Sequence, residues 1–345
     1  MTTSAIGQAW KHRRAVAGGA LYWSGLAYMF EGIARPTGAI IVTYHSVAAG
    51  DHAEFVDPPM HLAPRMFEKQ MAFLREHRNV VSLSALVAQL EAGETPVAGT
   101  VCITFDDGYL DTLTVAAPIL ARYQLPATVY LPTRYIDRAQ SQWADVVHWA
   151  FRCRTCDRLE FSSDDLVLNL ADESQRIAAR RSLQTRLLES SYADRSELLE
   201  SLERQLRPTG SMPRLTMNWN EVRDLMHRFP LFDIGGHSRD HIDLRAHRGE
   251  AARHEIAGCA ADLRRELGRE AGHFSFPYGR WSTETRSLMK AAGWRSGVGS
   301  SVDYRVGAST DRHLMARIET PLSMTALRFM TSGAFPGAYG LLGKR

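Results

Sequence analysis

Two adjacent carboxylates follow an apolar run at 101–105. This run, VCITF, is broken only by Thr104 and leads directly into Asp106, Asp107 and Gly108. Neighbouring like charges at the end of a hydrophobic run resist ionising together and are costly to desolvate. The pair therefore indicates chemistry in which each carboxylate has a different task.

Two histidines, His237 and His241, lie four positions apart in the segment IGGHSRDHIDL. If this stretch forms one helical turn, the two side chains share a face. Two imidazoles and one carboxylate make a three-ligand metal site with positions left open for water and substrate. One aspartate would then bind the metal, and the other would act as general base on metal-bound water.

Alternating strands and helices must position these residues. Apolar and β-branched runs predict strands at 38–47, 100–105, 126–133, 231–238, 272–279, 294–300 and 314–319. Helical periodicity predicts helices at 64–77, 84–93, 110–124, 248–268 and 283–293. This alternation favours an α/β fold with a parallel sheet or a (β/α) barrel, in which catalytic groups lie at the C-terminal ends of strands. Both the aspartate pair and the histidine segment occupy such ends.

The two βα series are separated by an Arg-, Glu- and Leu-rich segment whose leucines recur at helical spacing. We interpret it as a helical insertion. The predicted organisation is an N-terminal basic and amphipathic segment (1–37), the first part of the barrel (38–142), the helical insertion (143–226), and the second part of the barrel with a C-terminal tail (227–345).

Composition places the chain among ordinary globular proteins. Of its 345 residues 45% are hydrophobic and 23% charged, which permits a sizeable core. The net charge of +3 is too small to argue for nucleic acid, and no basic stripe with interleaved aromatics occurs. Four cysteines are too few for a disulfide scaffold.

The N-terminal segment has two interpretations. The basic stretch KHRR precedes an apolar stretch at 15–30 that is shorter than the roughly 20 residues that span a bilayer. No small-residue cleavage site follows, so a cleaved signal peptide is not expected. The stretch forms either an amphipathic helix packed on the domain or a helix in a membrane interface, with Trp23 and Tyr28 as anchors.

Three motifs resemble those of the NodB-type polysaccharide deacetylases, carbohydrate esterase family four. They are TFDDG at 104–108, HSRDH at 237–241 and FSFPYG at 274–279, in the order and strand-end placement typical of that family. The lead-in IVTYHSV at 41–47 also fits, and the similar pattern extends from about Gly38 to Pro321. The resemblance implies a distorted (β/α) barrel, related to the TIM barrel, that removes N-acetyl groups from amino sugars with zinc or another divalent ion.

The resemblance also implies a role for each matching residue. Asp106 corresponds to the general base, and Asp107 joins His237 and His241 as metal ligand. The backbone N–H of Tyr278 corresponds to the donor that stabilises the oxyanion.

The sequence departs from the family pattern at three motifs. The arginine that often braces the base in the third motif is missing, and Arg317 in LMARIE is the candidate replacement, with a surface ion pair as the alternative. The fourth motif is not recognisable. The C-terminal Leu-x-His that supplies the general acid is also absent, because His313 precedes its leucine.

His45 is therefore the predicted general acid. In a closed barrel the first and last strands are neighbours, so a histidine on the opening strand reaches the same site. The alternative is that His45 caps a buried strand through hydrogen bonds. An imidazole that gains and loses a proton near pH 7 suits protonation of the departing amine.

Two other functions stay open. One is a deformylase or deacetylase of a lipid-linked sugar at a membrane surface, which the N-terminal segment would suit. The other is a sugar-binding barrel without catalysis, although a binding module needs no unligated carboxylate beside a metal. The expected substrate is an N-acetylated glycan or lipid-linked sugar, with no nucleic acid partner. The expected location is the bacterial cytoplasm, with peripheral membrane contact in the second interpretation of residues 1–37.

Overall fold

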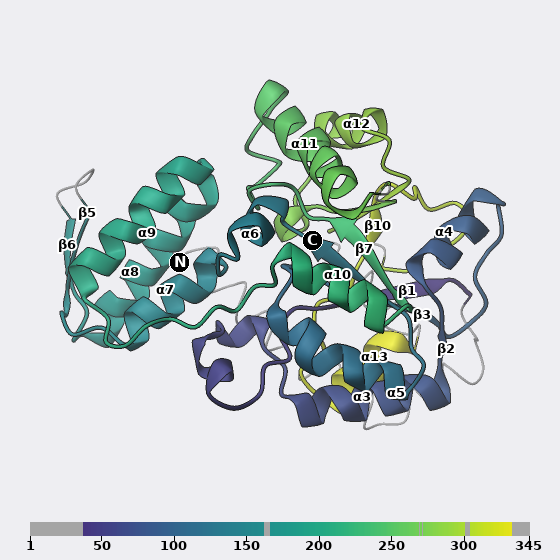
Figure 1. Cartoon of the computed structure of the whole chain (residues 1–345), viewed down its shortest axis with the longest axis horizontal. Helices are drawn as coiled ribbons and strands as arrows, with labels where there is room; N and C mark the ends of the chain where they lie inside the picture. Colours follow the sequence, from purple (N-terminus) through teal and green to yellow (C-terminus); the bar gives the residue numbers. More distant parts are fainter. Residues whose placement is uncertain (1–36, 162–165, 269, 271, 301–303, 333–345) are drawn as a thin grey trace, which may run out of the picture.

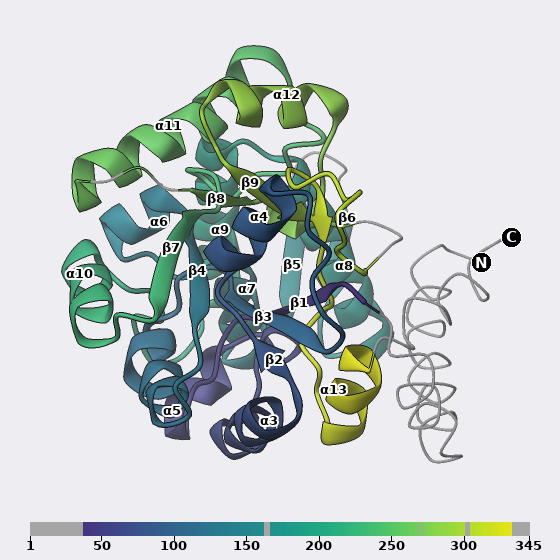
Figure 2. The same cartoon turned by 90° about the vertical axis from the view of Figure 1, so that its right-hand side faces the viewer.

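Parallel strands form one curved sheet in the computed structural model, which describes residues 37–161, 166–268, 270, 272–300 and 304–332. The eight strands of this sheet are β1 (Ala39–Tyr44), β2 (Asn79–Val80), β3 (Thr100–Phe105), β4 (Ala127–Leu131), β7 (Phe232–Gly236), β8 (His273–Ser275), β9 (Ser296–Gly299) and β10 (Met315–Ala316). Their order is β1-β3-β4-β7-β8-β9-β10, and β2 pairs with β3. Figure 2 shows these strands around a central axis.

The sheet closes through the chain that follows β10. Ile318 forms a parallel bridge with Val42, and its N–H donates to the carbonyl of Ile41 at 2.9 Å. The first and last strands are thus neighbours. The fold is the distorted (β/α) barrel that the sequence predicts.

Helices cover the outside of the barrel (Figure 2). Those that follow or precede barrel strands are α3 (Pro64–His77), α4 (Leu83–Glu91), α5 (Ala117–Arg122), α6 (Thr133–Arg138), α10 (Trp219–Arg228), α11 (Gly249–Leu267), α12 (Thr283–Ala291) and α13 (Met324–Thr331). Short 3-10 helices occupy Gly50–Phe55, Pro58–Met60 and Pro277–Gly279. The predicted helix at 110–124 is a π-helical turn, Thr112–Ala116, continued by α5.

Alternation along the strands divides the core into two layers. Val42 and Ile103 join the large apolar cluster that includes residues of α3, α5, α10 and α11. Ile41 and Cys102 belong instead to a cluster with residues of β4, β9, β10 and α4. Successive strand residues point to opposite faces, so a barrel strand is buried on both sides and reads as an unbroken apolar run.

The predicted insertion begins with a compact unit at 143–206. It contains α7 (Trp143–Arg152), a hairpin of β5 (Arg158–Phe161) and β6 (Leu166–Asn169), α8 (Glu173–Glu189) and α9 (Tyr192–Leu206). We call this unit the α7–α9 segment. It has its own apolar core and lies to one side of the barrel in Figure 1. The hairpin was not predicted. Helix α10, which begins within the range 143–226, packs on the barrel through Trp219 and Val222. The predicted domain boundaries stay a prediction.

The predicted N-terminal helix lies outside the described residues. Within the described ranges, none of the helices has the length and apolar character needed to cross a membrane.

Candidate active site

The chemistry-bearing residues gather at one end of the barrel because its strands are parallel. Strand C-termini of a parallel barrel share a rim, and the residue after each strand lies on it. The residues that follow directly are His45 after β1, Asp106 and Asp107 after β3, His237 after β7, and Arg317 after β10.

Three side chains converge as a metal-ligand cluster. Asp107, His237 and His241 each offer one ligand atom, and these atoms lie within 4.8 Å of one another. Asp107 Oδ1 is 3.2 Å from His241 Nε2 and 3.6 Å from His237 Nε2, and the two Nε2 atoms are 3.2 Å apart. All three side chains are buried, with residue exposures of 6% or less.

The donor set fits a divalent ion such as zinc. His237 Nδ1 lies 2.8 Å from the carbonyl oxygen of Ser275, so it carries the proton and leaves the Nε2 lone pair directed at the cluster. Burial lowers the pKa of His237 to about 4, which keeps the ring neutral at pH 7. Two imidazole nitrogens and a carboxylate are ligands that zinc prefers, with a fourth position left for water or substrate.

The histidine segment reaches this geometry without the expected helical turn. Residues 237–243 form a loop in which Ser238 has φ +61° and His241 has φ +49°. Asp107 also has a left-handed backbone, with φ +70°. Positive φ angles at non-glycine residues are strained and mark positions that the surrounding structure holds in place.

Asp106 and Arg317 form a two-point ion pair beside the cluster. Arg317 Nη1 donates to Asp106 Oδ1 at 2.7 Å, and Nη2 donates to Oδ2 at 2.6 Å. Nη2 also donates to Ser275 Oγ at 2.9 Å, and the guanidinium lies 5.5 Å from the ring centre of Tyr130. Ser275 occupies the region where the family motif often has its arginine. The arginine that contacts Asp106 here is Arg317, which follows β10 instead.

The electrostatics of this pair keep Asp106 ionised. Burial alone raises the pKa of Asp106, but the Arg317 guanidinium and then His237 outweigh it and hold that pKa well below its usual range. The pKa of Asp107 is also lowered, since His241 outweighs the effect of burial. Two adjacent carboxylates thus stay charged because each has its own cationic or hydrogen-bonding partner.

His45 lies near both aspartates. When protonated, its charge contributes to lowering the pKa of Asp106 and of Asp107. The residue is partly exposed, but its Nδ1 is buried and has no hydrogen-bond partner among the described residues. His313 instead precedes β10, at the opposite end of the strand, where its Nδ1 is 3.4 Å from Asp311.

Tyr278 is held at the rim by contacts on both sides. Its hydroxyl accepts a hydrogen bond from Trp143 Nε1 at 2.8 Å and donates to the carbonyl of His241 at 3.1 Å. Its ring centre is 4.7 Å from that of His241. The residue has φ +58°. The N–H groups that close the 3-10 turn belong to Gly279 and Arg280, so the Tyr278 N–H takes no part in the turn's hydrogen bonds.

Sequence reasoning missed three residues of this environment: Trp143, Arg195 and Ser275. Arg195 donates to the carbonyls of Asp240 and His241 at 3.1 and 3.0 Å. It is one of two arginines in α9 and one of many in the Arg-rich stretch 176–207, so no local pattern distinguishes it. The one sequence signal for Ser275 is the missing arginine of the third motif, because Ser275 lies in the region where that arginine is expected.

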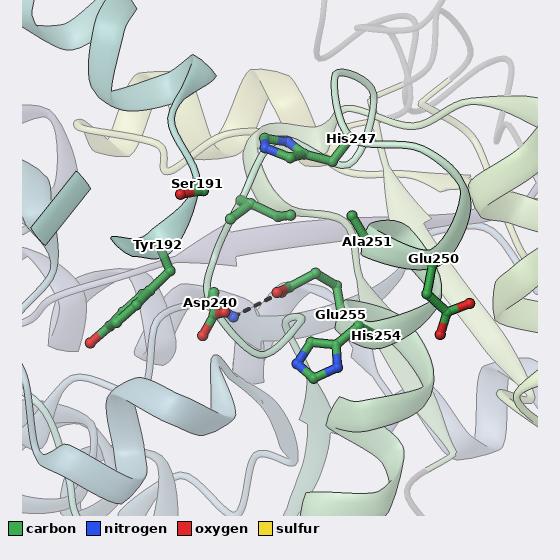
Figure 3. Close-up of a pocket in the computed structure, with 9 residues that line it drawn as sticks. Ser191, Tyr192, Asp240, His247, Glu250, Ala251, His254 and Glu255 are labelled. Atoms are coloured by element: carbon green, nitrogen blue, oxygen red, sulfur yellow. Dashed lines mark hydrogen bonds between the residues drawn. The ribbon is translucent and has the colours of Figure 1, made fainter. Parts of the chain in front are cut away.

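A cavity of about 320 Å³ lies next to the histidine loop. Figure 3 shows it between Tyr192, at the start of α9, and the first turns of α11, with Asp240 and Glu255 on its wall. Asp240 immediately precedes His241, but none of the three cluster residues lines this cavity. The cavity and the metal-ligand cluster are therefore separate features that share one loop.

Comparisons with known proteins agree with this fold. The family model described as polysaccharide deacetylase matches residues 93–179 and 207–297, just over half of the chain. The chain therefore belongs to the polysaccharide deacetylase family, a class of hydrolases. The matched ranges include Asp106, Asp107, His237, His241 and Tyr278, and exclude His45, Arg195 and Arg317.

Individual relatives are distant. A chitooligosaccharide deacetylase of Azorhizobium caulinodans is 37% identical over 73 residues, which is 21% of this chain and 34% of the relative. The chain spans about a third of the length of the curated relatives it matches.

Two solved structures show the same fold. The Streptococcus pyogenes deacetylase PplD, in complex with acetate, aligns over 86% of this chain and 98% of its own, with a TM-score of 0.58 and 15% identity. IcaB from Ammonifex degensii aligns over 87% of this chain and 97% of its own, with a TM-score of 0.53 and 14% identity.

Proposed function

We propose that this protein hydrolyses N-acetyl groups from amino sugars of a glycan, with a divalent metal ion held by Asp107, His237 and His241. One observation carries this proposal: a buried, ionised carboxylate, Asp106, lies directly beside a three-ligand cluster at the barrel rim. A bound ion supplies Lewis-acid chemistry, because it acidifies water and polarises the substrate carbonyl.

In this proposal Asp106 accepts a proton from the attacking water. Both of its oxygens contact Arg317, and each keeps a further lone pair for a water proton. The depressed pKa of Asp106 keeps the base ionised at neutral pH. Arg317 fixes the direction of the carboxylate, since a guanidinium binds a carboxylate as a rigid two-point fork.

The other two candidates act on the acyl group and the amine. The Tyr278 N–H is the proposed donor to the oxygen of the tetrahedral intermediate. His45 is the proposed acid that protonates the departing nitrogen, which leaves an amine on the sugar and acetate as the second product. Its proximity to both aspartates supports this role.

Acetate release tests the proposal. The protein should release acetate from N-acetylated chito-oligosaccharides, lose that activity on exhaustive chelation, and regain it when zinc or another divalent ion is added. His237→Ala should lose bound metal and activity together, whereas the control His52→Ala, at an exposed histidine of the first 3-10 helix, should lose neither. Full turnover after verified metal removal would reject the mechanism.

The lipid-linked substrate, the cytoplasmic location and membrane contact through residues 1–37 stay predictions. Liposome flotation of the full chain, compared with a chain that starts at residue 38, tests the membrane contact.

A further inference from the structure

Arg195 is a buried cation that the α7–α9 segment directs into the barrel. It lies in α9, is 1% exposed, and belongs to the stretch 180–206 that the family model leaves unmatched. Within the described ranges no carboxylate lies at ion-pair distance from its guanidinium. Its hydrogen bonds go chiefly to backbone carbonyls: Nε donates to Leu187 at 3.1 Å, and Nη1 to Asp240 and His241. Burying a charge in this way is costly, so its position calls for an explanation.

The target of these hydrogen bonds is the strained part of the proposed metal site. His241 has φ +49°, a conformation that costs a non-glycine residue about 1–3 kcal/mol unless its surroundings hold it. Its carbonyl oxygen accepts from Arg195 Nη1 at 3.0 Å and from the Tyr278 hydroxyl at 3.1 Å. That hydroxyl in turn accepts from Trp143 Nε1, in the first residue of α7.

Two residues of the α7–α9 segment thus act on one backbone carbonyl of the barrel. Arg195 acts directly, and Trp143 acts through Tyr278. The side chain of His241 depends on this backbone, because its Nε2 must face Asp107 Oδ1 at 3.2 Å and His237 Nε2 at 3.2 Å. If φ of His241 relaxed to a negative value, the imidazole would leave the cluster.

We propose that the α7–α9 segment completes the metal site, with Arg195 as the positioning residue that holds His241 in its ligating conformation. This inference rests on the proposed function, since it assumes that the cluster binds a divalent ion. It assigns the segment a part in metal affinity in addition to its own packing. Figure 1 shows the segment beside α6 and the barrel, and Figure 3 shows the start of α9 facing the loop that carries Asp240.

A purely architectural role is the alternative to exclude. Arg195 would then only attach α9 to the barrel, and its loss would lower stability without changing the metal site. Arg154 provides a control, because it also donates to carbonyls, those of Phe151 and Leu170, and these bonds and its ion pair with Asp157 lie entirely within the α7–α9 segment.

The experiment measures metal binding in the full chain. Wild type, Arg195→Met, Arg195→Lys and Arg154→Met are stripped of metal and titrated with Co²⁺ and Zn²⁺ against a chelator of known affinity. The visible spectrum of bound Co²⁺ reports ligand geometry, and thermal unfolding without metal reports stability. Arg195→Met should bind both ions tenfold or more weakly, as is usual for lost outer-sphere support of a ligand, with an altered Co²⁺ spectrum. Arg195→Lys should recover part of the affinity, and Arg154→Met should keep the wild-type affinity and spectrum whatever its stability.

Each other outcome has a distinct meaning. A folded Arg195→Met with wild-type affinity and spectrum would overturn the inference and leave the proposed function standing. A wild-type protein that binds neither ion would overturn both. If Arg195→Met does not fold, Trp143→Phe takes its place, because it removes the Nε1–H donor to Tyr278 and keeps an aromatic ring in the core of the segment. It should weaken metal binding several-fold, and unchanged binding would refute the inference.

Discussion

Replacing Arg317 with methionine should destabilise the fold through Asp106. The Arg317 side chain is 9% exposed and that of Asp106 5%, and two short hydrogen bonds join them. Removing one partner of a buried pair leaves an uncompensated charge and costs about 3–5 kcal/mol. Arg317→Met should therefore lower the free energy of unfolding at pH 7 by about that amount, measured by guanidinium denaturation with and without chelator.

A double-mutant cycle separates this pair from general packing effects. Asp106→Asn combined with Arg317→Met removes both charges. The loss of stability in the double variant should therefore be smaller than the sum of the two single losses, by a coupling energy of at least about 2 kcal/mol. The control Arg204→Met breaks an ion pair with Glu200 in which both side chains are exposed, by 66% and 71%. An exposed pair contributes about 0–1 kcal/mol, so the free energy of unfolding of this variant should stay close to that of the wild type.

The pH dependence has a definite sign. In the wild type the folded-state pKa of Asp106 is depressed, so its stabilising contribution is present above the unfolded value of about 3.9 and is lost as the pH falls toward the folded value. In Arg317→Met burial raises the pKa of Asp106. Acidification then protonates the carboxyl group and removes the cost of a buried, unpaired charge. The difference in free energy of unfolding between the wild type and Arg317→Met should therefore become smaller as the pH falls from 7 to 4. A coupling energy below about 1 kcal/mol, together with a stability difference that does not change with pH, would refute the reasoning.

Three further changes test the remaining groups. Asp106→Asn should retain metal, measured by elemental analysis, while acetate release falls by roughly a hundredfold or more; loss of the metal would reverse the roles of the two aspartates. His45→Ala should keep metal content and folding but lower kcat by roughly a hundredfold and flatten or move the alkaline limb of the pH–rate profile, and near-normal turnover would exclude His45 as the acid. Burial raises the pKa of Asp145 to about 8, so its contribution to stability decreases as the pH rises from about 4 to 8. Asp145→Asn should remove that decrease in denaturation curves, and an unchanged slope would contradict it.

Local sequence patterns predicted the barrel because each βα unit is encoded by a short stretch. The run at 100–105 became β3 with the predicted bounds, and the end of this strand placed Asp106 and Asp107 on the rim. The predicted strand at 231–238 became β7, which placed His237 there as well. Periodicity within five to twenty residues contains this information, and the parallel topology brings the strand ends together.

The surroundings of these residues were decided by contacts between distant parts of the chain. Arg317 meets Asp106 across 211 positions because the barrel closes between β1 and the segment after β10, and no local pattern distinguishes that arginine from one on the surface. The histidine loop shows the same limit: four-residue spacing suggested a helical turn, but left-handed backbones at Ser238 and His241 bring the imidazoles together. Arg195 is one of two arginines in α9. It is distinguished only by the packing of α9 against the barrel, which fixes the carbonyls that its guanidinium meets. Types and spacing of residues determined which groups stand at the rim, and tertiary packing decided how each is oriented and charged, because orientation and desolvation depend on neighbours that are remote in sequence.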